Sequence, residues 1–192
     1  YVVDILNYIM LEIGQPMHAY DLDKLSGKLR ISTSVKKEIF QGLNNEEYKL
    51  EKGFLTIKDN EHIQCLAGIL GSKNSMVTKK TQKVLIESAF FNPKSIINRA
   101  RSLKLQTESS YRFERGVDFL LPNLALDKFV NYIKDTDIKI LERKSLGKNS
   151  SLPKNKKLNI NLEDINSAIG TNLSKNEIYK IFLSLGCTIE KN

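Results

Sequence analysis

The sequence predicts an α+β protein with a β-rich core of mixed strands in layered sheets, helices on the flanks and a small, truncated α/β unit after it. Short apolar segments separated by glycine and asparagine turns fill residues 29–91, which is typical of strands. Apolar residues recur at helical spacing on both sides of that region. A basic, loop-like stretch then precedes a segment of different composition. We therefore expect a first domain at 1–142, a basic linker at 143–157 and a partial α/β domain at 158–192.

Length and composition place the chain among ordinary globular proteins. Its 192 residues, 41% of them apolar, suffice for one packed domain and a smaller second piece. No apolar run is long enough for a membrane span, and no signal peptide is visible. Two cysteines far apart fit neither a disulfide framework nor a zinc site, so a cytoplasmic location is expected. Because the chain opens on Tyr1 without an initiator methionine, we expect a fragment of a longer protein.

The first expected element is a helix at 2–13. Apolar residues repeat there at helical spacing, namely Val2, Ile5, Ile9 and Ile13. Gly14 is expected to end the helix. Pro16 then predicts a turn, which places His18 in a short loop.

Short strands are expected between residues 29 and 60, where the segments LRIS, EIF, YKL and FLTI alternate with turn residues. The next apolar run, IQCLAGILGS, contains Gly68 and Gly71. Glycine in such a run indicates either a tight strand-to-loop turn or a close approach of the backbone to a neighbour or ligand. Both interpretations stay open.

A buried strand is predicted at 84–91, because this apolar run is too short for a globular helix. Glu87 is its only charged residue. A glutamate in such a strand either pairs with an arginine or has a functional role. Four arginines are available as partners: Arg99, Arg101, Arg112 and Arg115.

Helices are predicted at 93–103, where an asparagine cap and a proline start the pattern, and at 123–134. Between them, Thr107 is expected to start a turn, with Ser109 and Ser110 capping the segment that follows. A buried acid, a hydroxyl cluster and a basic helix face in one short stretch predict a functional site.

The net charge of +8 is concentrated in the linker, which holds six basic residues and no acidic one. They are Arg143, Lys144, Lys148, Lys154, Lys156 and Lys157. A solvated linker is the favoured interpretation, because glycine, asparagine, serine and proline lie among them. A strip that contacts RNA phosphates is the alternative.

The segment after the linker, LNINLEDINSAIG, predicts a strand and then a short helix that Gly170 ends. Ser174 and Glu177 have the spacing of a capping box at the start of a second helix, which Gly186 ends.

The chain has no phosphate-binding loop, no dinucleotide fingerprint and no clustered cysteine and histidine set. The residues left for chemistry are His18, Glu87, Thr107 and the glycines at 68 and 71. Each has a structural alternative: a surface histidine, an ion-paired glutamate, a threonine that begins a turn, or glycines in a turn.

Three motifs occur in order: GQPMHAYD at 14–21, ESAFFNP at 87–93 and T-x-SSYRFERGVD at 107–118. Together they resemble the β subunit of bacterial phenylalanyl-tRNA synthetase, and more narrowly its editing module, the third and fourth domains. The similarity runs from Tyr1 to about Tyr132. The unit after the linker is similar to the start of the following small domain.

The resemblance implies roles for individual residues. Glu87 matches the glutamate that contacts the ring hydroxyl of a mischarged tyrosine, while His18 and Thr107 match pocket residues that we expect to be catalytic. The other residues expected to bind substrate are Gly71, Gly68, Asn7 and Ser109.

The activity implied is hydrolysis of mischarged Tyr-tRNA(Phe) by an ordered water, assisted by RNA hydroxyls and His18. An apolar pocket made for phenylalanine rejects tyrosine only about 10²-fold, so a second pocket that hydrogen-bonds the hydroxyl is useful. No cofactor is expected in this segment, while ATP and magnesium serve the parent ligase. The implied partners are the tRNA(Phe) 3′ end, the α subunit and the remaining β-subunit domains, in a heterotetramer and without a membrane.

Two alternatives stay open. One is a non-catalytic scaffold for tRNA or subunit binding, with a degenerate pocket. The other is a freestanding editing factor. The first draws on the positions at which the chain departs from the family pattern: Leu6, Ser72, Ser109 and Phe119.

Overall fold

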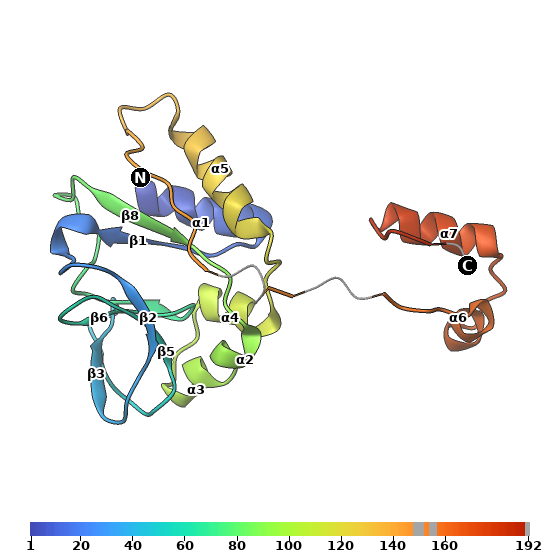
Figure 1. Cartoon of the computed structure of the whole chain (residues 1–192), viewed down its shortest axis with the longest axis horizontal. Coiled ribbons are helices and arrows are strands. Elements are labelled where there is room, and N and C mark those ends of the chain that lie inside the picture. The colour runs from blue at the N-terminus through green and yellow to red at the C-terminus, as the bar shows by residue number, and fades with distance from the viewer. Residues whose placement is uncertain (148–151, 154–156, 191–192) are drawn as a thin grey trace. The chain divides into compact units, whose positions relative to one another are not determined.

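The structure is a computed structural model that describes residues 1–147, 152–153 and 157–190. The chain forms two units, Tyr1–Gly147 and Lys148–Asn192. Helices and antiparallel sheets make up the first unit (Figure 1), and the predicted α+β class is confirmed. No helix within the described ranges is both long and apolar enough to cross a membrane.

A two-stranded antiparallel ribbon forms the middle of the first unit. β1 (Met17–Asp21) pairs with β8 (Val84–Ser88), and the register sets His18 opposite Glu87. Figure 1 shows the two strands, blue and green, side by side. The prediction of a loop at His18 is therefore wrong. The turn at Pro16 is short, and the backbone after it finds hydrogen-bond partners in β8, far away in the sequence.

The ribbon separates two apolar cores. One of its faces carries Ala19 and Ile86 into a smaller core shared with α1 (Val2–Ile13) and α5 (Leu121–Ile133). Successive residues of a strand point to opposite faces, so Tyr20 enters the main core on the other side. Both faces of the ribbon thus pack against other elements, and β1 is buried over its last three residues while β8 is half-buried.

The two helices of the smaller core form close to where the periodicity predicts them. α1 ends at Gly14, whose φ of 79° lies in the left-handed region that glycine adopts freely. α5 begins slightly before the predicted start and has Pro122 in its first turn. Figure 1 shows both helices beside the ribbon.

The main core is built on the short strands that the sequence predicts in its middle. These strands are β2 (Arg30–Thr33), β3 (Glu38–Gln41), β4 (Glu47–Leu50), β5 (Leu55–Lys58), β6 (Ile63–Leu66) and β7 (Leu70–Gly71). A 3₁₀ turn, η1 (Leu22–Lys24), connects the ribbon to them. One sheet has the order β2-β5-β6-β7, and β3 pairs with β4 as a separate hairpin. Every strand pair in the described part of the chain is antiparallel.

The helix predicted at 93–103 is broken into α2 (Pro93–Ile96) and α3 (Arg99–Ser102). Asn98, between them, has a φ of 62°, a left-handed conformation that asparagine tolerates better than most residues. The break turns Ile97 to the surface, with 51% of its side chain exposed. One apolar residue of the predicted stripe is thus lost from the core.

α4 (Glu108–Arg115) begins where the sequence predicts only a turn and a capped segment. Thr107 caps it: its hydroxyl accepts a hydrogen bond from the Ser110 backbone, and the Ser110 hydroxyl accepts one from the Thr107 backbone. Upstream, β8 ends at Ser88 rather than at the predicted Phe91, and Phe91 packs in the main core.

The described residues of the second unit contain two helices, α6 (Leu162–Ile169) and α7 (Lys175–Ser184). The capping box of Ser174 and Glu177 is confirmed. The strand predicted before α6 is wrong, because residues 157–161 have no regular structure. A lone strand needs a neighbour for its backbone hydrogen bonds, and the described part of this unit offers none.

Half of the linker cations lie outside the described residues, namely Lys148, Lys154 and Lys156. The other three have carboxylate partners: Arg143 with Asp127 at 2.6 Å, Lys144 with Glu142 at 2.6 Å and Lys157 with Glu190 at 2.7 Å. Exposed pairs of this kind contribute little to stability. They do reduce the positive charge that is free to meet phosphates, which favours the solvated-linker interpretation.

Candidate functional site

Five of the candidate residues meet at one small cavity of the first unit. Its volume is about 50 Å³, and β1, β8, the β6–β7 turn and α4 contribute to its wall. The five are His18, Gly68, Gly71, Glu87 and Ser109. The rest of the wall is mostly apolar and consists of Pro16, Met17, Cys65, Ile69, Leu70, Phe91 and Phe113.

The register of the ribbon brings the acid and the imidazole together. His18 and Glu87 are opposite partners, and opposite residues of an antiparallel pair project to the same face. Tyr20 follows on that face, and its ring lies edge-on to the His18 ring, with centroids 4.5 Å apart. Long-range strand pairing therefore builds the site from two distant segments.

The Glu87 carboxylate is held by Tyr20. The Tyr20 hydroxyl donates a hydrogen bond to Oε2, while Oε1 has no hydrogen-bond partner among the described residues. Burial raises the pKa of Glu87 to about 7, and the bond from Tyr20 opposes part of that rise because it stabilises the ionised form. A carboxylate with one open oxygen in an apolar wall is suited to accept a hydrogen bond from a ligand.

Glu87 has no arginine partner in the part of the chain that the structure describes, so the ion-paired interpretation is wrong. Other groups hold the four arginines: Arg112 pairs with Glu108, Arg101 and Arg115 pair with Glu114 at 3.8 and 2.8 Å, and Arg99 lies 5.2 Å from the centre of the Phe54 ring.

His18 is neutral at neutral pH, because burial lowers its pKa to about 4. The ring lies against Gly71, where an added Cβ would be 2.3 Å from His18 Cε1. The backbone at Gly71 therefore closely approaches a neighbouring side chain, which is one of the two interpretations open for these glycines. A neutral imidazole has one nitrogen that donates a hydrogen bond and one that accepts it.

Replacing His18 with glutamine is expected to reduce the loss of stability on acidification. Unfolded His18 takes up a proton below its ordinary pKa of 6.5 and folded His18 only near 4, so its contribution to stability is lost as the pH falls between these values. Glu87 acts in the opposite sense, since its raised pKa costs stability as the pH rises from 4.5 to 7. Relative to the native chain, His18→Gln should gain stability as the pH falls from 6.5 to 4, measured by urea unfolding.

The second histidine supplies the control. The His62 side chain is 57% exposed and lies outside the small cavity, so His62→Gln is the matched variant. Parallel curves for the native chain and His18→Gln would contradict the prediction.

Thr107 and Asn7 do not line the cavity. The Thr107 hydroxyl donates to the Ile69 carbonyl at 2.8 Å and accepts from Ser110, so it fastens the β6–β7 turn to α4. In this geometry Thr107 holds the wall in position. Asn7 lies on an exposed side of α1, which covers the other face of the ribbon.

Sequence reasoning missed Tyr20 and Cys65. Tyr20 would have been found by treating MHAYD as a strand, since alternate residues share a face. Cys65 lies on the buried strand β6, and burial raises the pKa of its thiol well above the ordinary value. The thiol is therefore protonated and is no candidate for a nucleophile.

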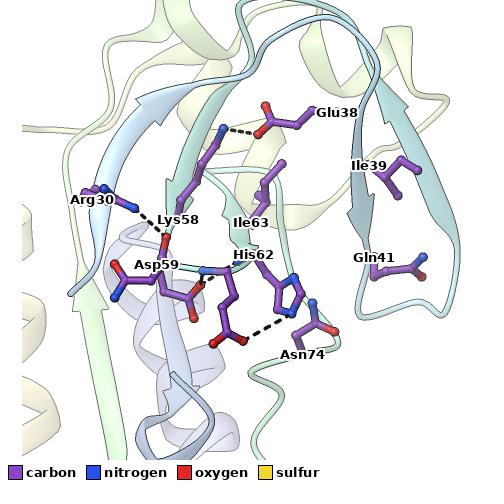
Figure 2. A pocket seen from close by; sticks show the side chains of 11 residues that line it. Arg30, Glu38, Ile39, Gln41, Lys58, Asp59, His62, Ile63 and Asn74 are labelled. Atoms are coloured by element: carbon purple, nitrogen blue, oxygen red, sulfur yellow. Dashed lines mark hydrogen bonds and ion pairs between the residues drawn. The ribbon is translucent and has the colours of Figure 1, made fainter. Parts of the chain in front are cut away.

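A larger hollow of about 510 Å³ opens elsewhere on the first unit and shares no wall residue with the small cavity (Figure 2). Its charged side chains are already engaged: Lys58 pairs with Glu38, and Arg30 donates to the Asp59 carbonyl at 3.1 Å. The Asp59 carboxylate accepts hydrogen bonds from four donors, the backbones of Ser26, Glu61 and His62 and the side chain of Gln64. This arrangement stabilises the turn between β5 and β6.

Comparison with known proteins finds relatives that match the part of the chain that forms the cavity. The model of the B3/4 domain family matches residues 1–137. Phenylalanine–tRNA ligase beta subunits of Acinetobacter baylyi and Coxiella burnetii are 36% and 37% identical over 98% and 99% of this chain. That of Legionella pneumophila is 45% identical over 69% of the chain. The resemblance to these β subunits is confirmed.

The chain spans 24% of the length of the Acinetobacter and Coxiella relatives and the matched part 17% of the Legionella one. A solved N-terminal fragment of the phenylalanyl-tRNA synthetase beta-subunit from Pyrococcus horikoshii aligns with a TM-score of 0.47 and 17% identity, over 93% of this chain and 53% of that one. Since the family model covers well over half of the residues, the chain belongs to the B3/4 domain family.

Proposed function

We propose that this chain is the editing segment of a phenylalanine–tRNA ligase β subunit and that its small cavity admits the tyrosine of Tyr-tRNA(Phe) for hydrolysis. The main support for this proposal is the surroundings and hydrogen bonding of the Glu87 carboxylate. It lines an apolar cavity, it already accepts a hydrogen bond from one phenol, and its Oε1 is open. An ionised carboxylate can accept several hydrogen bonds, so a second phenol hydroxyl can bind at Oε1. The matching relatives are named phenylalanine–tRNA ligase beta subunits, which supports the part of the proposal that concerns the ligase.

Discrimination follows from the cost of leaving Oε1 unpaired. Tyrosine brings a hydroxyl that donates to this oxygen. Phenylalanine would bury Oε1 of Glu87 without a donor, which costs about 1–3 kcal/mol. The pocket therefore selects for the hydroxyl, in the direction opposite to a pocket that prefers phenylalanine.

Hydrolysis requires a water at the ester carbonyl carbon. In the proposal the neutral His18 ring accepts a hydrogen bond from this water and orients it, with the Ser109 hydroxyl as a second polar group in the wall. The attack breaks the bond between the carbonyl carbon and the ribose oxygen, which takes up a proton, and tyrosine and tRNA leave. RNA hydroxyls near the ester assist the proton transfer.

A second candidate is a scaffold that binds tRNA or subunits without catalysis, and the cavity volume favours it. A space of about 50 Å³ holds a few waters, each of which needs about 10–15 Å³, but no tyrosine ring. The editing proposal therefore requires the wall to open when the substrate arrives. The two glycines of the wall, Gly68 and Gly71, lie at the β6–β7 turn and in β7.

In the proposal, ATP and magnesium serve the complete ligase. Among the described residues, no group of three or more histidine, cysteine, aspartate or glutamate side chains could hold a metal ion. No step of the proposed hydrolysis uses either group. The proposed partners are the 3′ end of tRNA(Phe), the α subunit and the other parts of the β subunit in a cytoplasmic heterotetramer.

A deacylation assay separates the two candidates. A ligase that carries this chain is mixed with Tyr-tRNA(Phe) or Phe-tRNA(Phe), and release of each amino acid is followed. The editing function predicts release of tyrosine well above the spontaneous rate and much slower release of phenylalanine. Binding of both tRNAs without accelerated release of tyrosine would instead support the scaffold.

A further inference from the structure

We infer that Tyr20 is a positioning residue for substrate discrimination: it holds Oε2 of Glu87 and thereby leaves Oε1 for the incoming hydroxyl. This inference rests on the proposed function. It concerns a residue that does not touch the substrate, because Tyr20 is absent from the cavity wall whereas Glu87 belongs to it.

The burial of Tyr20 argues that its hydroxyl is a fixed part of the site. The side chain has no exposed surface and packs in the main core. A ligand that displaced the hydroxyl from Glu87 would have to move the ring out of that core, with the loss of its packing. The substrate therefore meets a carboxylate of which one oxygen is permanently occupied.

Tyr20 contacts two polar side chains of the cavity, His18 and Glu87. It lies edge-on to His18 while its hydroxyl holds Glu87. A glutamate side chain has three rotatable bonds, and a hydrogen bond to one oxygen removes much of that freedom. Tyr20→Phe would keep the ring against His18 and remove the hydroxyl, which holds the carboxylate and also interacts with the Cys65 thiol.

The ionisation of Glu87 gives an independent measure of this contact. The titratable groups that face Glu87 are His18 and Tyr20 from β1 and Cys65 from β6. The other face of the ribbon packs against apolar side chains of α5, including Ala125 and Phe129. Removing the Tyr20 hydroxyl takes away the one donor that the described residues give the carboxylate, and it should raise the pH at which Glu87 titrates.

The experiment compares Tyr20→Phe with the native protein in the complete ligase. The expected result is a fall of about tenfold in kcat/KM for Tyr-tRNA(Phe), mainly through a higher KM, with little change for Phe-tRNA(Phe). In a Glu87→Gln background, Tyr20→Phe should cause no further loss of discrimination. Tyr48→Phe is the matched control, because its hydroxyl accepts from Asn44 at 2.6 Å and lies outside the cavity wall.

The second readout is the carboxyl infrared band that disappears in Glu87→Gln, followed against pH. Tyr20→Phe should shift its midpoint upward, and Tyr48→Phe should not. An unshifted midpoint, equal losses on both tRNAs, or faster release of tyrosine by Tyr20→Phe would overturn the inference. If the native ligase releases no tyrosine, the proposed function fails, while the infrared titration still decides whether Tyr20 holds Glu87.

Discussion

Replacing Glu87 with alanine is expected to lower hydrolysis of Tyr-tRNA(Phe) by about tenfold to a hundredfold. A hydrogen bond to a charged group contributes about 1.5–3 kcal/mol, and about 1.4 kcal/mol corresponds to one decade in rate. Hydrolysis of Phe-tRNA(Phe) should fall less or rise, because the unpaired carboxylate that disfavours phenylalanine is gone. Deacylation rates of both tRNAs in the complete ligase measure the difference.

A stability measurement distinguishes this prediction from a structural role of Glu87. The alanine variant also leaves the buried Tyr20 hydroxyl without its acceptor, which costs about 1–3 kcal/mol of folding free energy. Glu87→Ala combined with Tyr20→Phe removes both partners and should recover much of that stability without restoring discrimination. Equal losses on the two tRNAs, together with a lower melting temperature, would rule out recognition by Glu87.

Replacing Gly71 with alanine is expected to destabilise the first unit by about 1–3 kcal/mol and to reduce editing. The added Cβ would lie 2.3 Å from His18 Cε1 and 2.9 Å from Leu43 Cδ1, closer than side-chain atoms approach. Tyr20 packs edge-on against the His18 ring and limits its movement on that side. Urea unfolding and deacylation of Tyr-tRNA(Phe) measure the two effects.

A double-mutant cycle locates the clash. In a His18→Ala background, Gly71→Ala should cost less, and the part of the cost that remains is assigned to Leu43. Gly14→Ala is the control: no atom lies within 4 Å of its added Cβ, and its penalty comes from the φ of 79°. Truncation of His18 should leave that penalty unchanged. A cost of Gly71→Ala that is the same in both backgrounds would show that His18 is not the obstacle.

Local patterns in the sequence predicted most of the fold. The apolar run around Glu87 predicted β8, and apolar residues at helical spacing predicted α1 and α5. In each case residues of the pattern pack against a core. The predictions failed where a distant strand partner or the backbone angle of a single residue determines the secondary structure. Asn98 adopts a left-handed conformation and breaks a helix that the apolar stripe continues through. The second unit shows the reverse, a strand-like segment before α6 that lacks a neighbour to pair with.

The sequence indicated which residues belong to the candidate site, but not which residues they contact. A lone acid in an apolar strand marked Glu87, but its partner could not be inferred, because Tyr20 lies 67 positions away. His18 was assigned to a loop for the same reason: only the pairing with β8 makes its segment a strand. The hydroxyl of Thr107 has two protein partners, which no local pattern reveals.

The ribbon of β1 and β8 is joined by strand pairing to no other sheet in the described residues. A two-stranded ribbon is marginal by itself, so the two cores on its faces hold it closed. One local opening event would separate the carboxylate on β8 from both the imidazole and the phenol, which are carried by β1. The free energy of that opening depends on α5 as well as on the main core. A change at Phe129, which lies on the far side of the ribbon, can therefore reach the cavity without touching any of its residues.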